Sequence, residues 1–140
     1  MGKKFGGVWH MPYPQWRQMR TDLNGLFPHL FPMDKGPRPA LAKGIHLEIL
    51  EATADRWTRA EVWSFLGRWV RRPRYLRSCA LNAPRVNLKG AVVGRVNDME
   101  AEYAARRLAR INLRRSWVGQ APLPVSAVEA MRVFRAGAAA

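Results

Sequence analysis

The segment between residues 57 and 84 constrains the fold most, because local chemistry sets a helix start, a helix end and a second helix start within it. Thr58 and Glu61 have the spacing of a capping box, in which each side chain bonds the backbone N–H of the other residue. The helix must end before Pro73, since the residue that precedes a proline is disfavoured in the α region. Pro73 itself suits the first turn of a new helix. The sequence therefore predicts two successive helices that meet at Arg72-Pro73.

Two further helices are expected before this pair. Leu23, Leu26 and Phe27 recur at helical spacing before a proline, which predicts a short core helix that ends near Phe27. Residues 45–54 place apolar residues on one side and acidic residues on the others, which is typical of an amphipathic helix. Residues 1 to about 20 show neither a helical nor a strand period, so we expect a loosely ordered arm there.

A β-hairpin and a long helix are expected after the second helix of the pair. Polar and apolar residues alternate over 85–89, a glycine supplies the turn, and 91–96 fits a returning strand. Asn97 and Glu100 form a second capping box, and the helix that they open should reach Arg114. The elements together predict a compact, mostly helical α+β fold with one β-hairpin.

We expect one domain with a tail at each end, because 140 residues is the size of a single domain. The predicted division is a basic, loosely ordered N-terminal arm at 1–21, a domain at 22–116, and a linker with a C-terminal tail at 117–140. The tail favours one short helix over 126–135, capped by a serine with a glutamate three residues later.

The charge of the chain favours a polyanionic partner. The 24 Lys and Arg residues exceed the 10 acids and give a formal net charge of +14. Repulsion at that density disfavours the compact state unless an anion supplies counter-charge. Nucleic acid is the commonest such partner; a membrane is less suited, because no apolar run approaches the ~20 residues that span a bilayer. The single cysteine, Cys79, excludes an intramolecular disulfide, and we expect a cytoplasmic protein without a signal peptide.

Basic residues gather in one tract that lacks acids. No Asp or Glu stands between Glu61 and Asp98. The basic residues of this tract are Arg68, Arg71, Arg72, Arg74, Arg77, Arg85, Lys89 and Arg95. Solvated surfaces normally interleave charges of both signs, so a tract of one sign over a helix junction, a helix and a hairpin favours polyanion binding over mere solvation.

The helix junction is the strongest candidate phosphate site. A helix N-terminus offers free N–H groups and the positive end of the helix dipole. Arg74 and Arg77 lie one turn apart on the second helix and can flank a bound phosphate. Tyr75 can stack on a base or bond a phosphate, and packing in the core beside Leu76 fits the sequence equally well.

The first hairpin strand adds a basic face. Arg85, Asn87 and Lys89 share one side of this strand. Val86 and Leu88 share the other side. Such a ribbon is well shaped to lie along the backbone of a duplex, and an exposed polar sheet face is the simpler alternative.

Several short motifs occur in the order and spacing of a known family. They are Leu30-Phe31-Pro32, Arg38-Pro39 before Leu41-Ala42-Lys43-Gly44-Ile45, Arg74-Tyr75-Leu76, and Ala83-Pro84-Arg85-Val86-Asn87-Leu88-Lys89-Gly90, followed by Gly94 and an Ala- and Arg-rich helix. On these motifs the chain resembles the ProQ/FinO family of RNA chaperones over roughly residues 26–114. The resemblance implies a compact α+β domain that binds structured RNA.

The resemblance also implies a partner and site residues. The RNA would be a stem-loop with a 3′ single-stranded tail, as in small regulatory RNAs, terminators and antisense RNAs, with a role in post-transcriptional regulation. The helix that begins at Arg74-Tyr75 would hold the RNA 3′ end, and the hairpin with Arg85 would follow the duplex. Charge and resemblance together give the predicted RNA-binding residues: Arg38, Lys43, Arg59, Arg71, Arg72, Arg74, Tyr75, Arg77, Arg85 and Lys89.

Three places depart from the family pattern. Val70, Arg71 and Arg72 stand where family members often carry Thr and Ser, whose hydroxyls help to grip the 3′ terminus. Charge therefore replaces hydroxyl contacts, which could relax selectivity for the 3′ end. Ala42 stands where a basic residue is common, with Lys43 one position away. Lys89 replaces an often acidic residue, which favours phosphate binding.

Catalysis finds little support in the sequence. The three histidines lack metal-ligand spacing, no carboxylate has an evident acid–base partner, and Cys79 has no nearby histidine, so we expect a buried structural cysteine. We expect a monomeric, non-enzymatic protein without a cofactor, a metal or a small-molecule substrate. Two other interpretations stay open: a DNA-binding or nucleoid-type module, since two helices around a turn resemble a helix-turn-helix, and a structural protein of a ribonucleoprotein particle.

Overall fold

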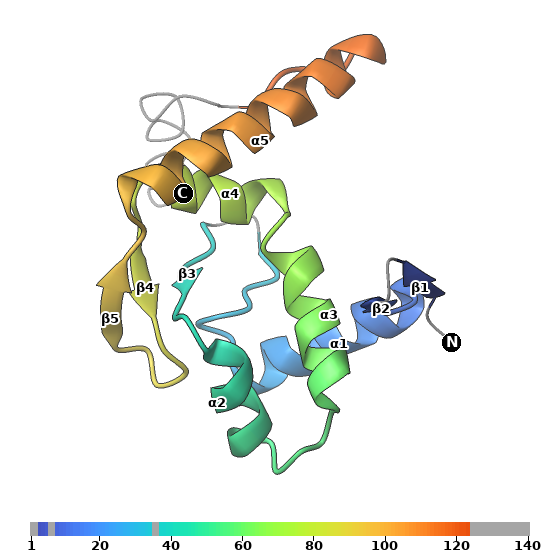
Figure 1. The fold of residues 1–140 in the computed structure, drawn as a ribbon, viewed down its shortest axis with the longest axis vertical. Coiled ribbons are helices and arrows are strands. Elements are labelled where there is room, and N and C mark those ends of the chain that lie inside the picture. The colour runs from blue at the N-terminus through green and yellow to red at the C-terminus, as the bar shows by residue number, and fades with distance from the viewer. Residues whose placement is uncertain (1–2, 6–7, 35–36, 124–140) are drawn as a thin grey trace.

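Helices surround a small sheet in the computed structural model, which describes residues 3–5, 8–34 and 37–123. The elements in chain order are β1 (Lys3–Phe5), β2 (Val8–His10), α1 (Tyr13–Leu26), β3 (Ala40–Leu41), α2 (Ile45–Ala52), α3 (Arg59–Trp69), α4 (Pro73–Ala80), β4 (Pro84–Val86), β5 (Val92–Arg95) and α5 (Asp98–Trp117). Figure 1 shows α4 beneath α5, and the sheet beside both. The predicted α+β class is confirmed.

The junction between α3 and α4 follows the local rules of the sequence. The Thr58 hydroxyl accepts the N–H of Glu61 at 3.1 Å, and the Glu61 carboxylate accepts the N–H of Thr58 at 2.8 Å. The helix ends at Trp69, and the next begins at Pro73. The predicted capping box and the predicted junction are confirmed.

The expectation of an irregular arm is wrong for residues 13–20, which belong to α1. Trp16, Met19 and Leu23 recur at helical spacing and are buried in this helix. Its N-cap is Pro12, and a second proline occupies the first turn, where the missing N–H costs nothing. Burial of the apolar stripe therefore outweighs the irregular composition. The predicted end of this helix, near Phe27, is confirmed.

Strands β1 and β2 pair with each other in antiparallel, and a separate sheet has three strands in the order β3-β4-β5. Strand β3 pairs with β4 in parallel, and β4 with β5 in antiparallel. The predicted hairpin is confirmed, with shorter strands than expected, because Asn87 begins the turn. Its side-chain oxygen accepts the N–H groups of Lys89 and Ala91 at 3.0 and 2.9 Å, and Gly90 has a φ of +85° that favours glycine. Asn87 and Lys89 are therefore turn residues, and they do not share a strand face with Arg85.

Aromatic rings from α1, α3 and the segment after α1 form the centre of the core, with Trp16 and Phe65 stacked and Phe31 edge-on to Trp69. The ring centroids of Trp16 and Phe65 are 5.2 Å apart, and those of Phe31 and Trp69 are 5.3 Å apart. All four side chains are almost completely buried. Aromatic side chains of this size contribute much of the apolar area that holds a small domain together.

Helix α5 starts at the predicted cap and runs three residues further than the expected end at Arg114. Asn97 accepts the N–H of Glu100 at 2.8 Å, which confirms the second capping box. Ala101, Ala104 and Leu108 are buried in the first half of α5, and the second half projects from the molecule (Figure 1). No helix in the described part of the chain has the length and hydropathy needed to cross a bilayer. The helix expected over 126–135 lies outside the described residues.

The capping box of α3 can be tested with a matched pair of threonine substitutions. Thr58→Ala removes the acceptor of the Glu61 N–H, so it should lower the free energy of unfolding by about 1 kcal/mol, measured by urea denaturation. Thr21→Ala makes the same chemical change at an exposed position inside α1, where it should have no destabilising effect. Equal losses in both variants would contradict the assigned role of Thr58.

Candidate nucleic-acid interface

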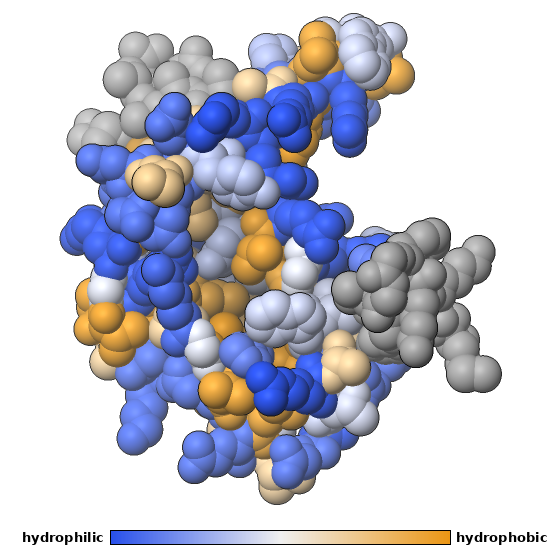
Figure 2. Space-filling model, in the orientation of Figure 1, coloured by the Kyte–Doolittle hydropathy of each residue, from blue (hydrophilic) through white to orange (hydrophobic). Residues whose placement is uncertain are grey.

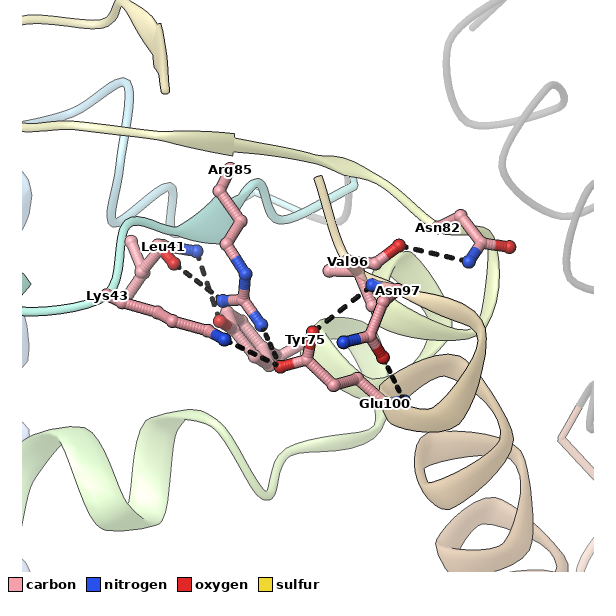
Figure 3. Close-up of polar contacts among 8 residues, drawn as sticks. All are labelled: Leu41, Lys43, Tyr75, Asn82, Arg85, Val96, Asn97 and Glu100. Carbon is pink, nitrogen blue, oxygen red and sulfur yellow. Dashed lines mark hydrogen bonds and ion pairs between the residues drawn. The ribbon is translucent and has the colours of Figure 1, made fainter. Parts of the chain in front are cut away.

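The Arg85 side chain is at the centre of a polar cluster that connects the sheet to α5. Its guanidinium donates to the carbonyl of Leu41 at 2.8 Å and to the carboxylate of Glu100 at 2.6 Å. Only 15% of the Arg85 side chain is exposed, and its Nε atom is buried without a partner among the described residues. Figure 3 shows this guanidinium between Leu41 and Glu100, with Lys43 beside it. Arg85 is therefore held inside the fold, and it does not extend from a strand face as expected.

Glu100 neutralises part of the charge at this cluster. One carboxylate oxygen accepts the N–H of Asn97 at 3.2 Å, and the other contacts Arg85 and lies 3.9 Å from the ammonium of Lys43. The bond from the Asn97 backbone, with the charges of Arg85 and Lys43, holds the pKa of Glu100 below its ordinary value despite partial burial. The carboxylate is therefore ionised at neutral pH and paired with both cations.

Tyr75 lies against the same cluster on α4. It is buried, and its hydroxyl oxygen accepts the N–H of Leu41 at 3.1 Å, which connects α4 to β3. Burial raises the pKa of Tyr75 to about 12, so the hydroxyl stays protonated. The protonated oxygen keeps a hydrogen to donate. Of the two alternatives that the sequence left open for Tyr75, the structure shows packing in the core, and a contact of its hydroxyl with RNA stays a prediction.

A pocket of about 490 Å³ opens over Tyr75 and Arg85. Its basic side chains are Lys43, Arg71, Arg85 and Arg107, and its aromatic side chains are His46, Trp63, Tyr75 and Tyr103. An adjoining hollow between α4 and α5 shares Tyr75, Arg85 and Tyr103 with it. Figure 2 shows this face of the molecule hollowed below α5, with hydrophilic side chains around apolar ones. Aromatic rings among cations are the features that bind unpaired bases and their phosphates.

Trp63, Tyr103 and Arg107 were not predicted from the sequence as site residues. Trp63 is 59% exposed, and its ring packs edge-on against His46 with centroids 5.0 Å apart. Arg107 donates to the Tyr103 hydroxyl at 3.2 Å. Helical periodicity placed neither Trp63 nor Tyr103 on the buried side of its helix. An aromatic residue on the exposed side of a helix can indicate a binding surface, and this was the sequence signal that could have identified both.

A second group of predicted residues surrounds the buried guanidinium of Arg38. It lies 3.8 Å over the ring of Trp69, which is close enough for a cation–π contact. Arg38 is 6% exposed, and two of its nitrogen atoms lack partners among the described residues. Burial, and then the charges of Arg74, Arg72, Arg20 and Arg77, lower the pKa of Arg38 to about 10.

The two groups use different sides of α4. Arg74 and Arg77 lie one turn apart on one side, whereas Arg77 and Tyr75 are separated by nearly half a turn of the helix. Arg74 donates to the carbonyl of Asp34, away from the cluster of Arg85 and Glu100. The single continuous groove expected from the sequence is therefore divided into a pocket at Arg85 and an arginine cluster at Arg38.

The remaining predicted residues lie outside both groups. Arg59 is exposed at the start of α3, more than two helix turns from the end of that helix. Lys89 is exposed in the hairpin turn, where it lines a hollow with Glu48 and Glu51 of α2. Acids beside Lys89 make this end of the hairpin less positive than its own sequence suggests.

Comparison of the sequence with known proteins identifies the family to which the chain belongs. The sequence model described as the ProQ/FINO family matches residues 15–117. The chain belongs to the ProQ/FinO family. It is 32% identical over 98 residues to the RNA chaperone ProQ of Haemophilus ducreyi, which covers 69% of this chain and 53% of that protein. It is 33% identical over 85 residues to the RNA chaperone ProQ of Pasteurella multocida, covering 59% and 40%.

The fold agrees with the family. The crystal structure of a FinO-like RNA chaperone from Neisseria meningitidis MC58 superposes with a TM-score of 0.51 at 26% identity, covering 67% of this chain and 80% of that one. The chain spans about half the length of the curated ProQ relatives, so the family match concerns the part that they share with it. The resemblance stated from the motifs is confirmed.

Family membership also bears on catalysis. The relatives that the chain matches are named RNA chaperones, which agrees with the expectation of a non-enzymatic protein. Cys79 is buried, and burial raises the pKa of its thiol to about 11, which leaves it unreactive at neutral pH. Among the described residues, no three His, Cys, Asp or Glu side chains gather as metal ligands would.

The stabilising role of Glu100 can be tested through its pH dependence. Its lowered pKa means that Glu100 stabilises the fold above the ordinary value of 4.5, and that this contribution is lost as the pH falls through the lowered pKa. Glu100→Gln should therefore lower the free energy of unfolding by ~1–2 kcal/mol at pH 7, and by much less at pH 3. Glu102→Gln, at an exposed position of the same helix, should have little effect at either pH. A pH-independent loss in Glu100→Gln would contradict an ionic role.

Proposed function

We propose that this protein is an RNA chaperone that binds stem-loops followed by a 3′ single-stranded tail and acts in post-transcriptional regulation. Small regulatory RNAs, terminators and antisense RNAs have this form. Family membership supports binding of RNA, and the chaperones of Haemophilus ducreyi and Pasteurella multocida are named for that activity. The excess of basic residues favours a polyanionic partner in the cytoplasm.

The observation that carries the proposal is the pocket over Tyr75. Its exposed rings, Trp63 and Tyr103, can stack on unpaired bases, and Arg71 and Arg107 stand beside them to hold phosphates. The protonated hydroxyl of Tyr75 can donate to a phosphate or a terminal ribose. A pocket of this size admits the end of a single strand and excludes a duplex, so the tail would occupy it.

The arginine cluster at Arg38 provides a second contact for the stem. Arg74 and Arg77 repel each other and Arg38, and phosphates of a duplex backbone would relieve this repulsion. Because this cluster and the pocket share α4, one RNA can place its tail in the pocket and its stem along the cluster. Arg59 and Lys89 would add weaker contacts at the periphery, since both are exposed, and Lys43 would add one at the pocket.

Comparative binding tests the proposal directly. A hairpin with a U-rich 3′ tail should bind more tightly than the same hairpin with a blunt end, the tail alone or a DNA duplex of equal length, all at one salt concentration. Preference for duplex DNA would instead indicate a nucleoid-type module. Co-purification with ribosomal subunits and no preference among the RNAs would indicate a structural protein of a ribonucleoprotein particle.

Two arginines of α5 separate pocket contacts from general charge. Arg107 lines the pocket, and Arg110 is exposed one turn further along the same helix. Arg107→Gln should weaken binding of the tailed hairpin about tenfold and reduce the slope of log affinity against log salt by ~0.7–0.9, the value for one phosphate contact. Arg110→Gln should change affinity less than twofold. Equal effects would leave only nonspecific attraction.

Trp63 can be tested as a base-stacking residue against another exposed tryptophan. Trp63→Ala should weaken binding of the tailed hairpin by ~1–3 kcal/mol, the range for one stacked base, and leave the blunt hairpin unchanged. Trp63→Phe keeps a ring and should retain most of the affinity. Trp117→Ala changes an exposed tryptophan at the far end of α5 and should affect neither RNA. Equal losses on both hairpins would contradict a role in holding the tail.

A further inference from the structure

A separate cavity lies on the side of α3 that faces α1 and the end of β2. Its volume is about 230 Å³, and its polar lining comes from His10, Ser64, Arg68, Arg71 and Arg72. Pockets for drug-sized ligands are usually larger, about 300–1,000 Å³, so this cavity suits a small group such as a phosphate. Only Arg71 belongs both to this cavity and to the pocket over Tyr75.

Aromatic rings hold the arginines of this cavity in place. The guanidinium carbon of Arg68 lies 5.7 Å from the ring centroid of Trp16 and 5.3 Å from that of Tyr13. The guanidinium carbon of Arg72 lies 5.6 Å from the same Trp16 centroid. Arg20 lies over the Trp16 ring as well, at 5.2 Å. Cation–π attraction at these distances favours the position of a guanidinium beside the ring and leaves its N–H groups free to donate.

The hydrogen bonds of the cavity leave donors unused. Arg71 donates through Nε to the carbonyl of Gly67 at 2.7 Å, so its two terminal nitrogens stay available. Ser64 accepts the N–H of Met11 at 2.9 Å through its hydroxyl oxygen, and the hydroxyl hydrogen has no acceptor within the described part of the chain. Guanidinium groups can donate and cannot accept, so an anion is the complement of this lining.

The ion pairs found between described residues do not compensate these charges. The ion pairs between described residues are those of Lys43 and Arg85 with Glu100 and of Arg56 with Asp22, and none includes Arg68, Arg71 or Arg72. Three like charges around so small a space repel one another, which destabilises the fold until an anion enters.

We propose that this cavity binds a phosphodiester group of RNA, at a site additional to the pocket over Tyr75. Arg68 and Arg72 hold the two free phosphate oxygens, and Ser64 donates a hydrogen bond to one of them. Arg71 forms the wall between the cavity and the pocket, so a strand that leaves the pocket can place its next phosphates here. The inference rests on the proposed function only in that the anion belongs to RNA.

A double substitution with a charge-matched control tests this site. The variant Arg68→Gln/Arg72→Gln should weaken binding of the tailed hairpin about tenfold and reduce the salt slope by ~0.7–0.9, the value for one phosphate. The control Arg110→Gln/Arg114→Gln removes two exposed arginines from α5 and should change affinity less than threefold. Equal changes in slope and affinity in the two double variants would overturn the inference.

A lysine variant separates charge from packing. Arg68→Lys/Arg72→Lys keeps both charges and should retain the salt slope of the unchanged protein, with circular dichroism used to verify folding. If the lysine and glutamine variants lose affinity equally, the arginines act by packing on Trp16, and the cavity is not a phosphate site.

An experiment with inorganic phosphate tests whether the cavity binds phosphates of RNA or a free anion. At equal ionic strength, phosphate should raise the Tm of the unchanged protein above its value in chloride and should not do so for Arg68→Gln/Arg72→Gln. This stabilisation, combined with an unchanged RNA affinity of the glutamine variant, would identify a site for a free anion and contradict the RNA assignment.

The cavity site and the proposed preference for tailed hairpins can fail independently of each other. The salt slope counts phosphate contacts with any RNA, so the site is supported if the slope falls even where tailed and blunt hairpins bind equally. A clear preference for the tailed hairpin with an unchanged slope would overturn the cavity alone.

Discussion

The guanidinium of Arg85 bonds the carbonyl of Leu41 and the carboxylate of Glu100, so one side chain connects β3, β4 and α5. Strands β3 and β4 contain two and three residues, and so few ladder bonds do not by themselves hold the sheet against the helices. Tyr75 joins α4 to the same point by accepting the N–H of Leu41. These elements form part of the pocket wall, with α2 and α3 forming the rest. The shape of the pocket therefore depends on Arg85, whose charge is already paired with Glu100. A phosphate that contacts Arg85 must therefore compete with Glu100, whereas Arg71 and Arg107 are free of such competition.

On the side of α4 away from Tyr75, arginines lie close enough together to repel one another. Arg38 lies over Trp69, and its burial, followed by the charges of four nearby arginines, lowers its pKa to about 10. An aromatic face is a weak substitute for a carboxylate, because its attraction for a cation is about 0.5–2 kcal/mol. Aromatic rings thus orient these cations without neutralising them. The chain keeps its positive potential for an external anion, and the fold becomes more stable when that anion binds.

Local rules were sufficient where a feature depends on adjacent residues, and failed where it depends on distant contacts. Thr58 with Glu61, and the proline at 73, determine helix ends within one turn, so both were predictable. Helix α1 was missed because its prolines resemble those of a loop, and only the burial of Trp16 against Phe65 shows the stripe to be part of the core. Charge density indicated a class of partner that the family match also supports. The sequence did not show that Arg85 pairs with Glu100, fifteen residues away, or that Arg77 and Tyr75 face different sides of one helix.

The structure shows where the residues lie that depart from the family pattern at Val70, Arg71 and Arg72. Val70 lines the pocket and the adjoining hollow, so an apolar wall stands where family members often present hydroxyls. Arg71 separates the pocket from the cavity at Trp16, and Arg72 faces that cavity. Hydroxyls that bond a terminal ribose distinguish a 3′ end from an internal nucleotide, whereas arginines attract every phosphate alike. If the proposed function holds, selectivity for a tail would have to come from the size of the pocket and from stacking on Trp63 and Tyr103, which an internal unpaired segment can satisfy in part. The exchange of hydroxyls for arginines would then favour affinity for flexible single strands over strict recognition of a terminus.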